Sequence, residues 1–478
     1  MNFSIEFEEL EGQYKDVCRL SAKGVKCELY LPDELLKDNA KSKAEELLES
    51  LNDIAQNISF VKPDSDSEET EEKENKEPAV EWYGVEIDES NTDPAGAVTR
   101  IGNMDLHRQL PVQNGMRRCL LLDDGTVNYY LDANDSGDKD DGTLADLCGN
   151  DGQVMVEIPD HYILVERNGD KVSVRMSAVE GAIEGAVLVP KHYISAYQAS
   201  VVDETLCSYS EVYATTNKTI GEFRSAAMRR GKGWSQYQYN DAVDLYWLFL
   251  VEYANRNSQA EFTPELDKDG FHQGGLGVGC TYIEDFGGHY PYASNGFTNS
   301  LGNKTGEAAI NGGVVNSYRG IENPFGNIYT FLDGIVNVKG KIYRTFNTEL
   351  CCDFDMGKTP ADYGYWLDAE YNKTIYGYSL CLNIGNSKFG SILISEKGKN
   401  GIGYTDYSGV DADSLDCVCG GGCAGDGAVD APVCGLACVD ACGDDFGSAL
   451  ASLGSRLCFH KDGTTVVFPK KNDNENAA

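Results

Sequence analysis

A run of forty residues near the C-terminus, from Ser414 to Leu453, uses only nine residue types: Ser, Leu, Asp, Cys, Val, Gly, Ala, Pro and Phe. These types make up about half of an ordinary composition, so chance gives such a run odds on the order of one in a trillion. All nine can be encoded by codons that end in C, while Asn, Thr, Ile, Lys and Glu are missing. We infer that adenines have been lost from the codons of this segment. Residues determined by such a loss of adenines, and not by packing, are tolerated where their side chains point away from the core. We therefore expect the segment on the surface of a scaffold whose backbone other residues hold in place.

The composition bounds the kind of protein. The 478 residues, 41% of them hydrophobic, can bury two or three cores, and the length predicts two to four domains. Acidic residues outnumber basic ones by 77 to 40, and the net charge of −37 argues against nucleic acid as a partner. No apolar run reaches the roughly 20 residues that cross a bilayer, and the acidic start lacks the pattern of a secretory signal. We therefore expect synthesis in a cytoplasm and no membrane insertion.

Sixteen cysteines raise the question of a metal framework. Ten are scattered without metal-ligand spacing and are expected to be small buried hydrophobic residues in a reducing compartment. The other six lie between Cys417 and Cys442, where three-residue gaps occur but no paired short knuckles and no histidine that could complete a zinc site. We therefore assign no metal and no cofactor.

The order of segments predicts an α+β protein with five regions. Residues 1–60 hold two strand-like runs, "FSIEFEEL" and "VKCELYLP", and a helical pattern over 32–58, which together predict a small α/β N-terminal module. Residues 61–80 are nearly all charged or small and are typical of an acidic disordered linker. A β-rich middle region follows over 81–189, then a C-terminal domain over 190–468 and a disordered tail over 469–478.

Local signals predict particular elements within these regions. An Asp-Gly pair at Asp124 and an Asn-Gly pair at Asn168 each separate two apolar runs, which predicts two β-hairpins. The stretch "YNDAVDLYWLFLVEYANRN" carries apolar residues at helical spacing and predicts a core helix. No H-E-x-x-H, G-x-S-x-G or phosphate-loop pattern occurs, and the six histidines are far apart in the sequence, so no catalytic residue is assigned.

Four segments carry a family resemblance by occurring in a fixed order. They are "VPKHYISAYQAS" (189–200), "WSQYQYNDAVDLYWLFLVEYANRNSQ" (234–259), "SYRGIENPFGNIYTFLDGI" (317–335) and "LGSRLCF" (453–459). In these segments the chain resembles the variable proteins of diversity-generating retroelements, which occur in phages and prophages of gut bacteria. The resemblance covers roughly residues 100 to 460.

The resemblance implies a fold and an origin for the unusual segment. The family has a C-type-lectin-like C-terminal domain related to the formylglycine-generating enzymes, whose "GNVWEW"-like element matches residues 326–331. In the family a reverse transcriptase misreads adenine and turns AAC codons into any NNC codon, so residues 414–453 would be the variable region and its cysteines would have no ligand role. The ligand-binding candidates are Cys417, Cys419, Cys423, Asp426, Val429, Asp430, Val433, Cys434, Gly435, Cys438, Val439, Asp440, Cys442, Asp444, Asp445, Phe446 and Leu450.

A separate set of residues is expected to hold the backbone of this domain. We expect Ile328, Tyr329, Phe331, Leu457 and Phe459 in core strands. Arg456 is expected to be a buried hydrogen-bond donor that supports the structure and does not contact a ligand. Phe446 is the only aromatic residue of the variable region, which predicts weak binding at a single site because aromatic side chains supply most of the contact area in adaptable binding surfaces.

The function that the resemblance implies is receptor binding by a phage or prophage tail. The partners would be a protein or glycan on the host cell surface and, through the N-terminal module, the phage particle; a homotrimer would raise avidity. The protein would be made in the bacterial cytoplasm and act in the virion. A surface or pilus-associated display protein of a bacterium stays open as an alternative, as does an oxidase similar to the formylglycine-generating enzymes. A low-complexity loop without any partner is the simplest alternative for the segment itself.

Overall fold

A computed structural model describes the chain over residues 4–9, 16–22, 25–30, 80–278, 291–310, 313–354, 358–398, 404, 406–422, 427–428 and 431–469. The chain divides into two compact units, Met1–Glu77 and Pro78–Ala478. The fold is mostly β-sheet with few helices, 38% strand and 12% helix, and includes a curled half-barrel sheet. The β-rich character expected from the sequence is therefore confirmed.

The described part of the first unit is a three-stranded antiparallel sheet in the order β1-β2-β3, formed by β1 (Ser4–Glu9), β2 (Asp16–Ala22) and β3 (Val25–Tyr30). Two of these strands were predicted, and β2 was not. The helix expected over 32–58 lies outside the described residues, as do the linker up to residue 79 and the tail after residue 469.

The second unit begins with a five-stranded sheet in the order β11-β9-β10-β4-β5. Its strands are β4 (Tyr83–Asp88), β5 (Val98–Gly102), β9 (His161–Asn168), β10 (Lys171–Ser177) and β11 (Val187–Val189). Strands β9 and β10 form the hairpin predicted from the Asn-Gly pair, and Lys171 lies opposite Asn168. Gly169 in this turn has a φ of 62°, a conformation that glycine adopts without steric cost.

A six-stranded sheet follows in the order β15-β32-β12-β8-β6-β7. Its strands are β6 (Arg117–Leu121), β7 (Val127–Tyr130), β8 (Gln153–Ile158), β12 (His192–Ser195), β15 (Trp234–Gln236) and β32 (Leu457–Phe459). Strands β6 and β7 form the hairpin predicted from the Asp-Gly pair. Because β8 pairs with β12, and β12 with β32, this sheet joins residues from both sides of the boundary expected at 189/190. No division between compact units falls there.

The largest sheet has the order β23-β22-β21-β27-β30-β26-β24-β25, with β31 paired to β21 at its side. Its strands are β21 (Tyr329–Val338), β22 (Lys341–Arg344), β23 (Trp366–Glu370), β24 (Ile375–Asn383), β25 (Leu393–Lys397), β26 (Tyr407–Val410), β27 (Leu415–Gly421), β30 (Val439–Ala441) and β31 (Leu453–Gly454).

Shorter elements complete the described chain. The helices are α2 (Met104–Gln109) and α3 (Ile220–Met228). The short strands are β13 (Ser200–Val202), β14 (Thr205–Cys207), β16 (Phe262–Thr263), β17 (Gln273–Gly274), β18 (Gly306–Ile310), β19 (Gly313–Tyr318), β20 (Ile321–Glu322), β28 (Gly427–Ala428) and β29 (Ala431–Pro432).

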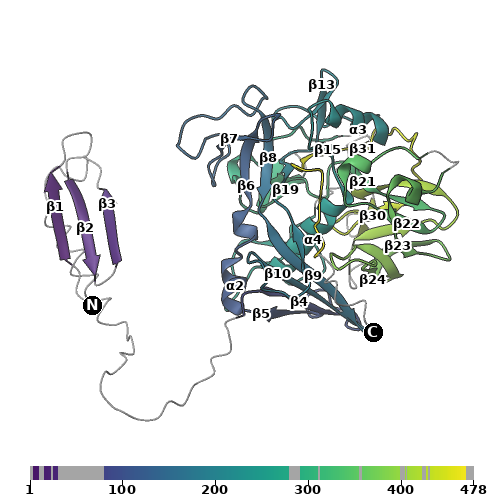
Figure 1. Ribbon diagram of the computed structural model, residues 1–478, viewed down its shortest axis with the longest axis horizontal. Coiled ribbons are helices and arrows are strands. Elements are labelled where there is room, and N and C mark those ends of the chain that lie inside the picture. Colours follow the sequence, from purple (N-terminus) through teal and green to yellow (C-terminus); the bar gives the residue numbers. More distant parts are fainter. Residues whose placement is uncertain are drawn as a thin grey trace, which may run out of the picture. The chain divides into compact units, whose positions relative to one another are not determined.

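Helix α4 (Tyr239–Tyr253) is the predicted core helix, and every one of its residues is buried. It lies in the middle of the second unit and contacts β4 and β10 of the five-stranded sheet on one side and β21 of the largest sheet on the other (Figure 1). A helix covered on both sides has no polar face, so its acidic residues each need a buried partner. Asp241 pairs with His460, Asp244 with His161 and Glu252 with Arg319. Among the described helices none is both long and apolar enough to span a membrane.

Four of the five expected scaffold residues lie in strands, Tyr329 and Phe331 in β21 and Leu457 and Phe459 in β32, whereas Ile328 directly precedes β21. Ile328, Phe331, Leu457 and Phe459 are buried, and Tyr329 is half-buried. Arg456 is buried and donates hydrogen bonds to backbone carbonyl oxygens, among them that of Asn323 at 2.5 Å and that of Ser195 at 3.3 Å. The interpretation of Arg456 as a structural hydrogen-bond donor is confirmed.

Candidate functional site

The segment 414–453, called the window below, is part of the largest sheet. Its first strand, β27, lies between β21 and β30, with Cys419 opposite Phe331 of β21. Its second strand in this sheet, β30, pairs with β27 and runs parallel to β26. Strands β28 and β29 form a small hairpin between them. The window therefore supplies interior strands as well as loops.

The expectation that the window's side chains leave the core is wrong for a third of the candidates. Six of them are buried: Cys417, Cys419, Cys434, Gly435, Cys438 and Val439. Cys417 and Cys419 point to the same face of β27 and join a hydrophobic cluster with Phe331 and Leu453, whereas Cys434 and Val439 join the main core. The physical reason is that Cys, Val and Gly are small and apolar, so they pack in a sheet interior without polar groups to satisfy.

The other candidates divide into three groups. Half-buried ones are Val433, Asp440, Cys442, Asp444 and Phe446. Exposed ones are Asp445 and Leu450, the latter 48% exposed. Cys423, Asp426, Val429 and Asp430 lie outside the residues whose side chains the structure describes.

We call residues 440–450 the rim, because this stretch holds most of the accessible candidates. Phe446 packs edge-on against Phe354, with ring centres 5.7 Å apart, and Phe354 packs in the same way against Tyr363 and Tyr365. The carbonyl oxygen of Leu450 accepts a hydrogen bond from the amide of Asn217 at 3.0 Å. Phe354 and Tyr363, which lie outside the window and are half-buried, thus extend the contact area that Phe446 alone offers, and the sequence analysis did not predict this.

A hollow of about 660 Å³ adjoins this side of the molecule, next to Asn217 in the sequence. Lys218, Glu222, Arg229 and Asp353 are among the residues that line it. Its wall carries both signs of charge, and Asp353 is also bound by Arg224 at 2.6 Å. A mixed polar wall of this kind favours hydrogen-bonded ligands over purely apolar ones.

The rim carries a group of carboxylates with raised pKa values. Burial raises the pKa of Asp440 to about 6, and the neighbouring charges of Asp444 and Asp416 add to this rise. Burial also raises the pKa values of Asp416 and Asp444. The Asp440 Oδ1 atom accepts hydrogen bonds from the backbone amide of Cys442 at 3.0 Å and from its thiol at 2.7 Å. These contacts hold the start of the rim in place, and the raised pKa means that Asp440 loses its negative charge as the pH falls through about 6.

Cys417, Cys419 and Cys442 of the window are not activated thiols. Cys417, Cys419, Cys434 and Cys442 are free, and burial together with nearby aspartates raises the pKa values of Cys417, Cys419 and Cys442 above the ordinary thiol value. Reactive cysteines need a lowered pKa and an electropositive setting. The arrangement therefore gives no support to a catalytic thiolate pair in β27.

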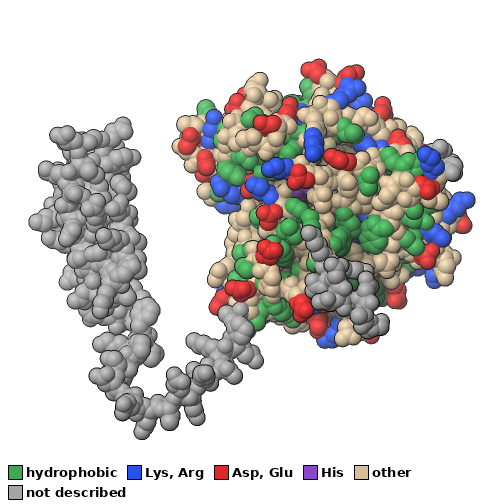
Figure 2. Space-filling model, in the orientation of Figure 1, with side chains coloured by type: hydrophobic (Ala, Val, Ile, Leu, Met, Phe, Trp, Pro, Cys, Tyr) green, Lys and Arg blue, Asp and Glu red, His purple; other side chains and the backbone are tan. Residues whose placement is uncertain are grey.

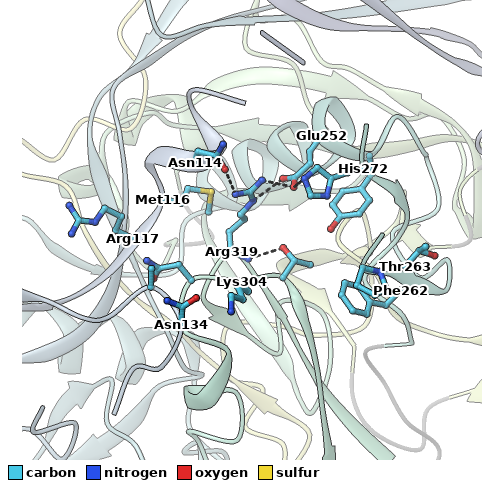
Figure 3. A pocket seen from close by; sticks show the side chains of 15 residues that line it. Asn114, Met116, Arg117, Asn134, Glu252, Phe262, Thr263, His272, Lys304 and Arg319 are labelled. Carbon is cyan, nitrogen blue, oxygen red and sulfur yellow. Dashed lines mark hydrogen bonds and ion pairs between the residues drawn. The ribbon is translucent and has the colours of Figure 1, made fainter. Parts of the chain in front are cut away.

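A pocket away from the window is shown in Figure 3, with a volume of about 610 Å³. At one end Arg319 holds the buried Glu252 at 2.6 Å and donates to Asn114 Oδ1 at 2.7 Å, while Tyr318 donates to Glu252 at 3.0 Å. Figure 3 shows Lys304 on the near side of Arg319, with Arg117 and Asn134 farther round the wall. A positively charged wall beside apolar side chains suits an anionic or polar small ligand. Sequence reasoning missed this pocket because its residues come from widely separated segments.

Charge is distributed evenly on the face drawn in Figure 2, where acidic and basic side chains are interspersed. The net charge of −37 does not produce a single acidic surface on this side. In the interior, the described residues include one group with the side-chain types of a metal site: His192, Asp241 and His460, all buried. No local sequence pattern indicates this group, since His460 and Asp241 are 219 residues apart.

Comparison with known proteins identifies no family for this chain, so its class is described by its fold alone. No model of a known protein family matches the chain, and no curated protein matches it. The chain is a mostly β-sheet protein with a buried central helix and a segment of restricted composition that enters its largest sheet.

Proposed function

We propose that this protein is a receptor-binding adhesin of a phage or prophage tail, whose window is diversified by a retroelement. The observation that carries the proposal is the restriction of forty successive residues to nine types that share C-ending codons. No packing requirement produces such a pattern, because the same restriction covers buried Val439 and exposed Asp445 alike. A mechanism that acts on the gene, and not on the fold, accounts for both.

The positions of the four resembling segments support the proposal. They contain β12, α4, β21 and β32, which are core elements, and β21 is the direct neighbour of the window strand β27. This is the arrangement that a fixed scaffold with a variable insert requires. Within the β-rich fold, we propose the C-type-lectin-like topology as the finer description of the C-terminal domain.

Burial narrows the ligand-binding face to the rim and the loops beside it. Buried window positions carry only small or apolar residues, so a randomised sequence that put a charge at Cys434 or Val439 would fail to fold and be lost. The rim accepts more residue types because most of its side chains are half-buried or exposed, with Ala441 as a buried exception. The proposed contact residues are therefore Asp440, Cys442, Asp444, Asp445, Phe446 and Leu450.

In this proposal, several copies of the binding site on one particle compensate for the weak binding of each copy. One aromatic residue gives the rim little area for a strong contact. A homotrimer on a tail would raise avidity by about 100- to 10,000-fold without any new contact. The N-terminal unit would attach to the particle and the acidic segment after it would give reach. A display protein on a bacterial surface or pilus would use the same face, with a different anchor.

Binding to intact bacterial cells tests the proposal. The purified chain, labelled with a fluorophore, is titrated onto candidate host strains with the rim variants Phe446→Ala and Leu450→Ala. We expect at least a tenfold loss of cell binding for each rim variant, and none for the matched control Leu144→Ala, whose side chain is 83% exposed and far from the window in the sequence. Unchanged binding by both rim variants would contradict the assignment of the rim. Copper-dependent oxidation of a cysteine-containing peptide, without cell binding, would favour the oxidase alternative.

A further inference from the structure

The motif Pro-x-His-Tyr-Ile occurs twice in the chain, over 159–163 and 190–194. In each copy the histidine Nδ1 lies 3.0 Å from the carbonyl oxygen of the proline two residues earlier. Because a carbonyl oxygen accepts only, Nδ1 carries the proton and donates. This bond fixes the ring and turns Nε2 inward, which is how histidines that bind metal ions are commonly oriented.

The two motifs lie together because, at the proline of each motif, the chain passes from one sheet to the other. Strand β8 of the six-stranded sheet continues through Pro159 into β9 of the five-stranded sheet, and β11 continues through Pro190 into β12 in the opposite sense. The register places Val189 opposite His161, and His192 opposite Ile158. The two imidazoles are therefore brought to the same junction between the sheets.

Helix α4 and the chain after β32 add three more groups at this junction. The Oδ1 atom of Asp244 lies 2.9 Å from His161 Nε2, and its Oδ2 atom lies 4.0 Å from His192 Nε2. The Oδ1 atom of Asp241 lies 3.0 Å from His460 Nε2, and the rings of His192 and His460 stack with centres 5.3 Å apart. All five side chains are at most 2% exposed.

Four atoms in this cluster have no hydrogen-bond partner among the described residues: His192 Nε2, Asp241 Oδ2, Asp244 Oδ2 and His460 Nδ1. The first three are lone-pair donors, since His192 carries its proton on Nδ1 and carboxylates only accept. Buried polar atoms are rarely left unpaired, because the loss of hydration is not compensated. What is missing between them is a positive charge and not another acceptor.

We propose that His192, Asp241 and His460 bind a structural zinc ion, and that Asp244, whose Oδ2 atom lies 4.0 Å from His192 Nε2, moves closer to complete the ligand shell. The ligand atoms of the first three residues already lie within 4.8 Å of one another. The separation of 3.0 Å between His460 Nε2 and Asp241 Oδ1 is close to the distance of about 3.3 Å between two ligands of a tetrahedral zinc ion. The ion takes the place of the proton that these two groups otherwise share.

The chemistry of the donor set selects zinc. Two imidazole nitrogens and two carboxylate oxygens form a closed four-ligand shell, as in structural zinc sites, and the two negative charges balance the ion. His161 holds the other oxygen of Asp244 and so orients it from outside the shell. The buried thiol of Cys458 lies beside Asp241, two residues before His460, and offers sulfur next to the same position. The ion joins α4, β12 and the chain after β32, and thereby fastens the scaffold that follows the window.

Metal analysis of the intact protein tests this site. The full chain is purified without a metal-affinity step from cells grown with added zinc, and its zinc content is measured by mass spectrometry. A second sample is unfolded, stripped with chelator and refolded with Co²⁺, whose absorption bands report tetrahedral coordination. We expect about one zinc per chain, the cobalt bands, and a higher unfolding temperature with zinc than with chelator.

Variants test whether metal binding depends on this cluster. His192→Gln is expected to lower metal affinity at least tenfold, while His107→Gln, which changes a buried histidine outside the cluster, leaves it unchanged. A folded wild-type protein that contains no stoichiometric zinc, shows no cobalt bands and unfolds at the same temperature in zinc and in chelator would overturn the proposal. These readouts use the wild-type chain and therefore do not depend on whether His192→Gln folds.

Discussion

Arg224 holds Asp333 with two parallel hydrogen bonds, from Nε to Oδ2 at 2.7 Å and from Nη2 to Oδ1 at 3.0 Å. Both side chains are less than 10% exposed. Arg224 belongs to α3 and Asp333 to β21, so this pair fastens the helix to the strand that borders the window. The window strand β27 is thus supported by a residue pair that lies outside the window.

Removal of this pair is expected to be costly. Arg224→Ala leaves the buried carboxylate of Asp333 without its cationic partner, and we expect a loss of about 3–5 kcal/mol in the free energy of unfolding. Arg229 at the end of the same helix pairs with Glu204 in solvent, so Arg229→Ala is expected to cost less than about 1 kcal/mol. Urea denaturation followed by tryptophan fluorescence measures both, since the four tryptophans lie in the second unit. Equal costs for the two variants would contradict the structural role of the pair.

Positions within the window are expected to differ in their contribution to stability. Val439 is 1% exposed and Leu450 is 48% exposed. Val439→Ala removes two buried methyl groups and should cost about 1–3 kcal/mol, whereas Leu450→Ala should cost less than about 0.5 kcal/mol. The same denaturation experiment decides this. If Val439→Ala proved neutral, the window strand β30 would not be part of the core.

The raised pKa of Asp440 predicts a pH dependence of stability. Its carboxyl has a pKa of about 6 in the folded protein, against an ordinary value of 3.8, so the folded state binds the proton more tightly. Stability from this group is present below about pH 4 and is lost as the pH rises to about 6. The loss is up to about 3 kcal/mol.

Asp440→Asn tests this directly, because the amide oxygen can still accept from Cys442 while the titration is removed. We expect the variant to lose less stability than the wild type between pH 4 and pH 6, as measured by denaturation midpoints across that range. Parallel pH profiles for the two proteins would show that Asp440 is not held in the protonated form.

How far the sequence predicts the fold depends on the range of the interactions. The hairpins at Gly125 and Gly169 follow from turn residues that act within a few positions, and the burial of α4 follows from its own apolar pattern. The pairing of β8 with β12 and of β12 with β32 is set by contacts between distant segments, which local sequence patterns do not show. The pocket around Arg319 and the histidine cluster escaped prediction for the same reason.

The candidate site was predicted in part. The composition of the window locates an unusual segment but does not say which side chains are exposed, since the small types Cys, Val, Ala and Gly are favoured in cores but are also tolerated on surfaces. The composition therefore does not distinguish Cys438 from Asp445, although Cys438 is buried and Asp445 is exposed. Only the pairing of β27 with β21 and β30 shows which window residues are buried and which are exposed.

The cysteines are expected to be thiols without a disulfide. Cys148 is exposed, whereas Cys119 and Cys458 are buried with raised pKa values. Iodoacetamide should label Cys148 first in the native protein, and Cys119 and Cys458 only after unfolding, as followed by mass spectrometry of peptides. Cys148→Ser removes the fast phase as a control. Disulfide-linked cysteines in the window would contradict their origin as products of randomised codons.

Sequencing of the window in many independent isolates of the source tests the central claim most directly. If the window is diversified by misread adenines, codons between residues 414 and 453 differ among isolates, the differing codons end in C, and a near-identical template repeat with adenines at the varying positions lies near a reverse transcriptase gene. The amino-acid changes at buried Cys434 and Val439 stay within small or apolar residues, whereas those at Asp445 and Leu450 range widely. A window that is identical in all isolates, or that varies mainly by silent third-base changes, would contradict the account.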